Sequence, residues 1–320
     1  MEFGRGISAE NGLPHLPPEH PLTTTLLTRS RAPDADNELF PTDLPVVRVG
    51  LSTWGDRAYR GTIYPPATAS GDFLAAYGQV FSTVELSATF YGLPDAARLV
   101  QWSAAVPREF RFLPKVSQSI THRDALADAQ QGLRVFLERT ESLGVQRGPV
   151  LLQLSPRFAP HAIAEDRLAA ALAVLGRQAA VEFRHPDWFV DDTTGEPPAG
   201  RILREHGSTL VVTDTVGARG VVHALLTAPA LVIRFVATGR PEIDGHRLRE
   251  WAQRINDWLG RGLREVYAYI HLDDPTTALA LTMQLRDGIN APARVLGPTP
   301  LPEAHPAVSP ELPHGQLSLF

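Results

Sequence analysis

The sequence predicts an α/β protein built as a single (β/α)₈ barrel of the TIM type, with a flexible, proline-rich tail at each end. Three observations lead to this prediction. Short apolar runs alternate eight times with longer amphipathic stretches between residues 46 and 288. The first run is not followed by Gly-x-Gly-x-x-Gly, which disfavours the competing doubly wound open sheet. Residues 1–45 and 289–320 are rich in proline and lack periodicity.

The predicted strands are runs rich in Val, Ile, Leu and Phe, bounded by turn residues. They cover residues 46–52, 82–87, 110–117, 149–155, 179–185, 209–214, 231–236 and 265–272. Apolar residues recur at helical spacing between them, most clearly at 72–81, 130–144, 165–176 and 245–260. The last stretch ends on Gly260, the residue type that often follows a helix, so we expect the helix to end there.

The composition is that of a globular protein. With 43% hydrophobic residues and a formal net charge of -5, the chain can bury a large core but has no overall charge that would attract nucleic acid or an anionic membrane. No run of about 18 apolar residues and no secretory signal pattern occurs. The absence of cysteine excludes disulfides and cysteine zinc ligands. We therefore expect a cytoplasmic protein without a membrane partner.

Lysine is almost absent from the chain. Of its 30 basic residues, Lys115 is the one lysine and the rest are arginines. An amine can lose its proton and attack carbon, whereas a guanidinium stays charged. Lys115 is therefore a candidate for chemistry that arginine cannot do, and its survival by chance is the alternative.

Barrels of this type place their active sites at the C-terminal ends of the strands, where inward-facing side chains meet. Alternation along the predicted strands puts a set of polar residues at this mouth. They are Glu85, Ser87, Lys115, Gln153, Glu182, Arg184, Asp214, Arg234, Tyr269 and His271. Buried charge is costly unless it is paired or solvated, so this collection indicates a binding or catalytic site. A stabilising ion pair of Glu182 with Arg234 is the alternative interpretation.

Several long motifs resemble the YecE-like family, domain of unknown function 72. They are VGLSTWG (49–55), FSTVELSATFYGLP (81–94), FRFLPKVSQSITH (110–122), PVLLQLSP (149–156) and VEFRHPDWF (181–189). The resemblance implies a TIM-like barrel and brings no settled activity with it. The family's characteristic positions fall on Trp54, Glu85, Phe90, Tyr91, Lys115, Gln153, Glu182, Arg184, Trp188 and Asp214. Arg234 is also retained, whereas His271 and Asp273 belong to a variant pattern.

Four of the predicted mouth residues are of the types that hold a divalent metal. They are Glu85, Glu182, Asp214 and His271. Such ligands are typical of the endonuclease IV and sugar isomerase barrels, which this chain resembles in outline. A divalent metal is therefore one candidate cofactor.

The basic residues of the mouth favour an anionic ligand instead. Lys115, Arg184 and Arg234 would repel a cation but suit phosphate or carboxylate oxygens. The aromatic residues beside the strand ends could stack on a base or a sugar, or could pack under the loops. They are Trp54, Phe90, Tyr91 and Trp188.

The chain ends in QLSLF, which resembles the bacterial sliding-clamp-binding peptide. In this interpretation Leu319 and Phe320 enter an apolar pocket of the clamp and Gln316 hydrogen-bonds at its rim, with Leu317 as a further partner-binding residue of the motif. The proline-rich segment before the motif would act as a spacer. A tail that folds back onto the barrel is the alternative.

A clamp motif and an anion-lined mouth together suggest a protein that binds or processes nucleic acid or another phosphate-bearing ligand, such as a phosphodiester hydrolase or lyase in DNA repair. We assign catalysis to Glu85, Lys115, Glu182 and Asp214, and substrate binding to Trp54, Tyr91, Gln153, Arg184, Trp188, Arg234 and His271. The alternatives are a sugar or sugar-phosphate isomerase or aldolase, and a non-catalytic phosphate- or nucleic-acid-binding module. A closed pocket at the mouth would favour a small molecule over a duplex.

Overall fold

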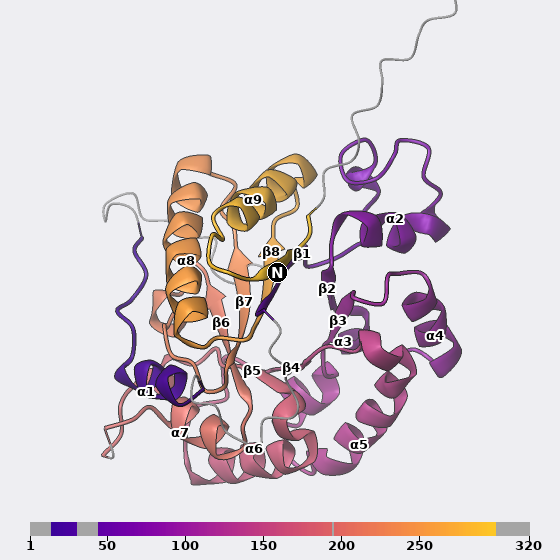
Figure 1. The fold of residues 1–320 in the computed structure, drawn as a ribbon. Helices are drawn as coiled ribbons and strands as arrows, with labels where there is room; N and C mark the ends of the chain where they lie inside the picture. Colours follow the sequence, from indigo (N-terminus) through magenta and orange to yellow (C-terminus); the bar gives the residue numbers. More distant parts are fainter. Residues whose placement is uncertain (1–13, 31–43, 194, 299–320) are drawn as a thin grey trace, which may run out of the picture.

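The structure, a computed structural model, describes residues 14–30, 44–193 and 195–298. Its centre is a barrel of parallel strands surrounded by helices (Figure 1). The strands neighbour one another in the order β3-β2-β1-β8-β7-β6-β5-β4. The predicted (β/α)₈ barrel is confirmed.

The barrel strands lie at the apolar runs predicted from the sequence. They are β1 (Val46–Leu51), β2 (Thr83–Leu86), β3 (Arg111–Pro114), β4 (Val150–Gln153), β5 (Ala179–Glu182), β6 (Thr209–Asp214), β7 (Ala230–Val236) and β8 (Glu265–His271). The α-helices are α1 (Pro21–Ser30), α2 (Phe73–Val80), α3 (Ala88–Tyr91), α4 (Ala96–Ala104), α5 (Ala129–Thr140), α6 (Ala162–Leu175), α7 (Pro198–Glu205), α8 (Pro241–Arg261) and α9 (Pro275–Asp287).

The barrel closes between β3 and β4 by short backbone bridges. Phe112 pairs with Arg147 and Lys115 with Leu151, both in parallel. Next to the second bridge, the Val116 amide donates to the Leu151 carbonyl at 2.9 Å. These bridges place Lys115 on the seam where the two ends of the sheet meet.

Between β1 and β2, a tyrosine hydroxyl supplements the backbone pairing, which joins Leu51 and Val84. Tyr77 accepts a hydrogen bond from the Leu51 amide at 2.8 Å and donates one to the Thr83 carbonyl at 2.9 Å. The two strands approach so closely that a Cβ atom at Gly50 would lie 2.0 Å from the Thr83 carbonyl oxygen. Glycine is therefore required at this position of β1.

Apolar side chains fill the barrel interior below the mouth. This layer contains Leu113, Leu151, Ala180, Val211, Val232, Tyr267 and Tyr269. The Tyr269 hydroxyl lies 2.8 Å from the Thr83 hydroxyl in this layer, so Tyr269 belongs to the core and not to the mouth as predicted. The filled interior means that ligands can enter only from the ends of the barrel.

The sixth β/α unit contains no α-helix. Between β6 and β7 the chain forms the short 3₁₀ turn η7 (Arg219–Val221). Helix α1, from before the barrel, packs beside α8 and on the segment that leads into β7 (Figure 1). The Thr23 hydroxyl accepts from the Leu226 amide at 2.9 Å, and Leu27 is fully buried in the core. Helix α1 thereby covers the part of the barrel that the sixth unit leaves bare.

This packing corrects the prediction that residues 1–45 form a flexible tail, because residues 14–30 are docked on the barrel. At the other end, β9 (Arg294–Leu296) pairs with the first half of β1, so the folded body extends beyond residue 288. Proline and threonine gave these segments the composition of a linker, and their few apolar anchors were too sparse to show a period. The rest of the tail predicted at residues 289–320, which is residues 299–320, lies outside the described residues.

Helix α8 passes the residue at which we expected it to end. Gly260 lies inside the helix, and the chain leaves it at Gly262, whose φ of 124° suits glycine. Across the described ranges, none of the helices is both long and apolar enough to cross a membrane.

Candidate functional site

A cavity of about 270 Å³ lies at the C-terminal end of the barrel. Strands on both sides of the barrel contribute to its wall, as expected for the mouth of this fold. The ionisable residues in the wall are Glu85, Lys115, Arg184, Arg234, His271 and Asp273. The mouth thus contains a cavity of small-molecule size, lined mainly by polar residues.

Arg234, on β7, joins the two buried glutamates of the site. Its Nε and Nη2 atoms donate to the two carboxylate oxygens of Glu85 at 2.9 and 3.1 Å. Its Nη1 atom donates to Glu182 Oε2 at 2.7 Å. The ion pair of Glu182 with Arg234, considered above as an alternative interpretation, is therefore present and extends to Glu85.

Both glutamates are ionised at neutral pH. Burial would raise the pKa of Glu182, but the positive charges of Arg234, Arg184 and Lys115 outweigh it and lower the pKa to about 2. Burial also opposes ionisation of Glu85, yet Arg234 and its other positive neighbours hold the pKa of Glu85 well below its usual value. Neither carboxyl group is thus a proton donor near pH 7.

Arg184 extends this network across to β4. Its Nε atom donates to Glu182 Oε1 at 2.8 Å, and its Nη2 atom donates to the Gln153 side-chain oxygen at 2.9 Å. Gln153 and Glu182 are buried beneath the cavity wall. We call Glu85, Gln153, Glu182, Arg184 and Arg234 the mouth network.

Lys115 reaches the cavity from the end of β3 and forms no ion pair within the described part of the chain. Lys115 is 1% exposed to solvent, and its Nζ atom lies 4.1 Å from the centre of the Phe90 ring. No hydrogen bond or ion pair joins this ammonium to any residue that the structure describes. Burial lowers the pKa of Lys115 to about 8, although Glu85 and Glu182 act in the opposite direction.

Two more cavity residues have polar atoms near these charges. The Thr213 hydroxyl is buried and has no hydrogen-bond partner within the described part of the chain. Sequence reasoning missed Thr213, which pairs in register with Arg234. His271 Nε2 lies 3.2 Å from Glu85 Oε2, and burial, reinforced by Arg234, lowers the pKa of His271, so the ring is neutral at pH 7.

The predicted aromatic residues divide into two pairs. Phe90 and Tyr91 line the cavity, and Tyr91 is 67% exposed. Trp188 is fully buried, stacks on Phe158 and donates from Nε1 to the Phe158 carbonyl at 2.6 Å. Trp54 packs edge-on against another tryptophan, 5.3 Å away. The structure therefore gives Trp54 and Trp188 packing contacts under the loops, outside the cavity to which the sequence assigned them.

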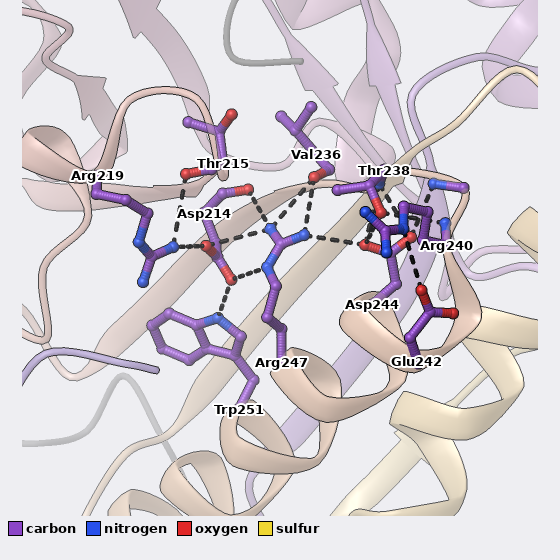
Figure 2. A network of polar contacts seen from close by, with 11 residues as sticks. Asp214, Thr215, Arg219, Val236, Thr238, Arg240, Glu242, Asp244, Arg247 and Trp251 are labelled. Carbon is purple, nitrogen blue, oxygen red and sulfur yellow. Dashed lines mark hydrogen bonds and ion pairs between the residues drawn. The ribbon is translucent and has the colours of Figure 1, made fainter. Parts of the chain in front are cut away.

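Asp214 does not face the mouth, contrary to the prediction (Figure 2). Its Oδ2 atom accepts from Trp251 Nε1 at 2.9 Å and from Arg247 Nε at 3.2 Å, both on α8. Its Oδ1 atom accepts from Arg219 at 2.6 Å. Strand β6 is buried on both faces and carries a polar residue on each, so alternation did not reveal which residues point inward, and Thr213 occupies the inward position.

Asp214 belongs to a second group of buried charges, between β6, β7 and α8 (Figure 2). Arg247 is fully buried and donates to Asp244 Oδ1 at 3.0 Å and to the Val236 carbonyl at 3.2 Å. Asp244 in turn accepts from the backbone amides of Thr238 and Gly239. We call Asp214, Arg219, Asp244, Arg247 and Trp251 the α8 network. It fixes the loop after β7, whose first residues form part of the cavity wall.

The structure does not assemble the predicted metal ligands into one site. Asp214 points toward α8, while Glu85 and Glu182 are occupied by Arg234. Within the described ranges, the group that could supply three ligand atoms to one ion lies elsewhere, at His15, His246 and Glu250. The residues of the clamp motif, which are Gln316, Leu317, Leu319 and Phe320, lie outside the described residues.

Fold and site together define a β/α-barrel protein with a small polar cavity at its C-terminal mouth and a buried lysine in the cavity wall. The sequence model of the family described as "Protein of unknown function DUF72" matches residues 48–306. The chain belongs to this family, and the resemblance to YecE-like proteins is confirmed.

Individual relatives agree with this assignment. The UPF0759 protein YecE of Escherichia coli K12 is 25% identical over 250 residues, which are 71% of this chain and 89% of that protein. The UPF0759 protein YunF of Bacillus subtilis is 40% identical over 76 residues, which are 24% of this chain and 26% of that protein.

Solved structures of the family share the fold. A DUF72 family protein from Thermotoga maritima superimposes with a TM-score of 0.65 at 24% identity, covering 76% of this chain and 98% of that one. A DUF72 family protein from Enterococcus faecalis gives a TM-score of 0.61 at 18% identity, covering 80% and 100%.

Proposed function

We propose that this protein binds a small phosphate-bearing ligand, of about the size of a sugar phosphate, in the cavity at the barrel mouth. The supporting observation is Lys115, a buried ammonium that faces the cavity and forms no ion pair with any residue that the structure describes. The two cavity arginines already have glutamate partners, so their charges are largely neutralised within the protein. An anionic group next to Lys115 would supply the missing partner of a buried charge.

The size and polarity of the cavity support a small molecule over a duplex. Its volume of about 270 Å³ is near the lower end for small-molecule sites and is far too small for double-stranded DNA. The Thr213 hydroxyl and the rim aromatic Tyr91 offer a hydrogen bond and a stacking surface for a sugar. A nucleic-acid substrate would have to present one flipped-out sugar and phosphate.

The presence of a single lysine allows a direct test. In protein labelled with ¹³C-lysine, one side-chain signal reports the titration of Lys115. We expect a midpoint near pH 8 without ligand, and a midpoint at least one unit higher with saturating ribose 5-phosphate, because a bound anion stabilises the ammonium. Ribose, which lacks the phosphate, is the matched control. Equal midpoints with ribose and ribose 5-phosphate would contradict the proposal.

A second candidate function is imine chemistry at Lys115, as in aldolases and lyases. The observation that favours it is the lowered pKa, which leaves about a tenth of the amine neutral at pH 7. The amine would add to a substrate aldehyde and the adduct would lose water to form the imine, which borohydride reduces to a stable secondary amine. Mass spectrometry should find this adduct with glyceraldehyde 3-phosphate in the wild type and not in Lys115→Arg.

Docking on a sliding clamp and action on DNA remain proposals that rest on the terminal QLSLF motif. In this version the clamp would bring the barrel to DNA, and the cavity would receive a flipped-out nucleotide. The full chain should bind the clamp with micromolar affinity, and deletion of residues 316–320 should abolish binding without changing thermal stability. Unchanged clamp binding by the shortened chain would exclude this role.

A further inference from the structure

Three side chains outside the mouth cavity direct ligand atoms toward one point. His15 comes from the segment before α1, and His246 and Glu250 lie one turn apart on α8. His15 Nδ1 is 2.7 Å from Glu250 Oε1 and 3.3 Å from His246 Nε2. His246 Nε2 is 3.5 Å from Glu250 Oε1. The three atoms thus form a compact triangle.

The size of this triangle matches a transition-metal site. A tetrahedral zinc ion with bonds of about 2.0–2.1 Å separates its ligand atoms by roughly 3.3 Å. Two of the three separations are within a few tenths of an ångström of this value, and the third needs to open by about 0.6 Å. Imidazole nitrogen and carboxylate oxygen are also ligand types that zinc accepts.

Hydrogen bonding alone accounts for the arrangement only in part. One proton on His15 Nδ1 satisfies the short contact with Glu250 Oε1. His246 Nε2 then faces His15 Nδ1, which already donates to Glu250, and Glu250 Oε1, which is 3.5 Å away. Neither atom gives His246 a good hydrogen bond. A cation in the centre would give all three lone pairs a partner at once.

The surroundings hold two of the ligands in place. The Leu16 amide donates to Glu250 Oε2 at 2.8 Å, which leaves Oε1 directed at the histidines. Arg219 donates from Nη2 to the His15 carbonyl at 2.6 Å, which fixes the backbone of the segment before α1. Such outer contacts orient metal ligands in known sites.

We propose that His15, His246 and Glu250 form a binding site for a divalent transition-metal ion of the zinc type. The ion would join the segment before α1 to helix α8, outside the mouth cavity and independently of its ligand. The His15 side chain is 69% exposed, so a fourth coordination position is open to water. His15 precedes residues 48–306, over which the family matches, so this chain supplies one ligand from its own N-terminal extension.

The test is zinc titration of the untagged full-length chain by calorimetry. We expect one Zn²⁺ per chain with micromolar or tighter affinity, and a loss of at least tenfold in His15→Gln, a change at an exposed side chain that leaves the fold intact. His206→Gln is the matched control, because this histidine, directly after α7, contacts the Ile202 carbonyl and lies outside the triangle, and the variant should bind zinc like the wild type.

A second measurement identifies the coordination. Cobalt(II) bound to the wild type should give the visible absorption bands of a four-coordinate ion, and these should disappear in Glu250→Gln. Equal zinc affinity in the wild type and His15→Gln, or wild-type binding no tighter than millimolar, would overturn the proposal.

Discussion

The barrel carries two groups of buried charges that differ in how completely their members are paired. In the α8 network, Arg247 is surrounded by carboxylate and carbonyl oxygens, and Asp214 and Asp244 each accept several hydrogen bonds (Figure 2). The mouth network is similarly paired through Arg234. The ammonium of Lys115 beside it, however, has no counterion among the described residues.

This difference separates a structural role from a binding role. A buried charge whose hydrogen bonds are all satisfied connects elements, and its removal leaves partners unpaired. A buried charge that faces a cavity without a partner is destabilising until a ligand arrives, and it is a candidate for function. Removing a charge from the α8 network and removing the charge of Lys115 should therefore change the stability in opposite directions.

The largest effect is expected in the α8 network. Arg247→Met removes the central guanidinium and leaves Asp214 and Asp244 buried with fewer donors, so the free energy of unfolding should fall by about 3–5 kcal/mol. Urea denaturation measures this change. Arg249→Met, at an exposed position on the same helix, should cost less than about 0.5 kcal/mol. Similar losses in both variants would show that pairing in the α8 network contributes little.

Removing the charge of Lys115 should have the opposite sign. The pKa of Lys115 is about 8 in the folded protein and 10.5 without burial, so the charged form is disfavoured by folding. The penalty, at most about 3 kcal/mol, is fully present below pH 8 and is relieved as the pH rises toward 10.5, because the unfolded chain then binds more protons.

Lys115→Met should therefore be at least as stable as the wild type at pH 7. Urea denaturation at several pH values measures the difference in free energy of unfolding between the wild type and this variant. This difference should shift in favour of the wild type as the pH rises from 8 to 9.5. The buried tyrosines also make stability depend on pH, but they do so equally in both proteins, so their effect cancels when the two free energies of unfolding are subtracted. A variant that is less stable than the wild type by more than about 1 kcal/mol at pH 7 would show that Lys115 is a paired, structural charge.

The smallest effect is expected at the edge of the α8 network. The Arg219 side chain is 31% exposed, and Asp214 keeps Arg247 and Trp251 when Arg219 is replaced. Arg219→Met should therefore cost only about 0.5–1 kcal/mol in urea denaturation. If Arg219→Met lowered the free energy of unfolding as much as Arg247→Met, the partly exposed ion pair would stabilise the fold as much as the buried one. Burial of the α8 network would then not explain its contribution to stability.

Most of the fold followed from sequence periodicity. The eight strands were predictable because each is a short apolar run between turn residues, and helices such as α5 and α8 have a clear apolar stripe. Helix α1 was not predictable in the same way, since its sequence PLTTTLLTRS has few apolar residues and its main anchors, Thr23 and Leu27, depend on contacts made with distant segments.

The site was predictable where one face of a strand is polar. Glu85 alternates with Val84 and Leu86, so its inward position was evident from the sequence, and Lys115, Glu182 and Arg234 followed by the same reasoning. Asp214 was misplaced because β6 is buried on both faces and has polar residues on each. The missing counterion of Lys115 and the triangle at His15 depend on distances between segments, which no local pattern reveals.

Helix α1 also has a consequence for how the protein is made. It leaves the ribosome before any barrel strand, yet Leu226, which bonds to Thr23, follows 203 residues later. At typical synthesis rates this interval is roughly 10–40 s. Helix α1, although translated before every barrel strand, must therefore wait until the sixth β/α unit has been made before its docking surface exists.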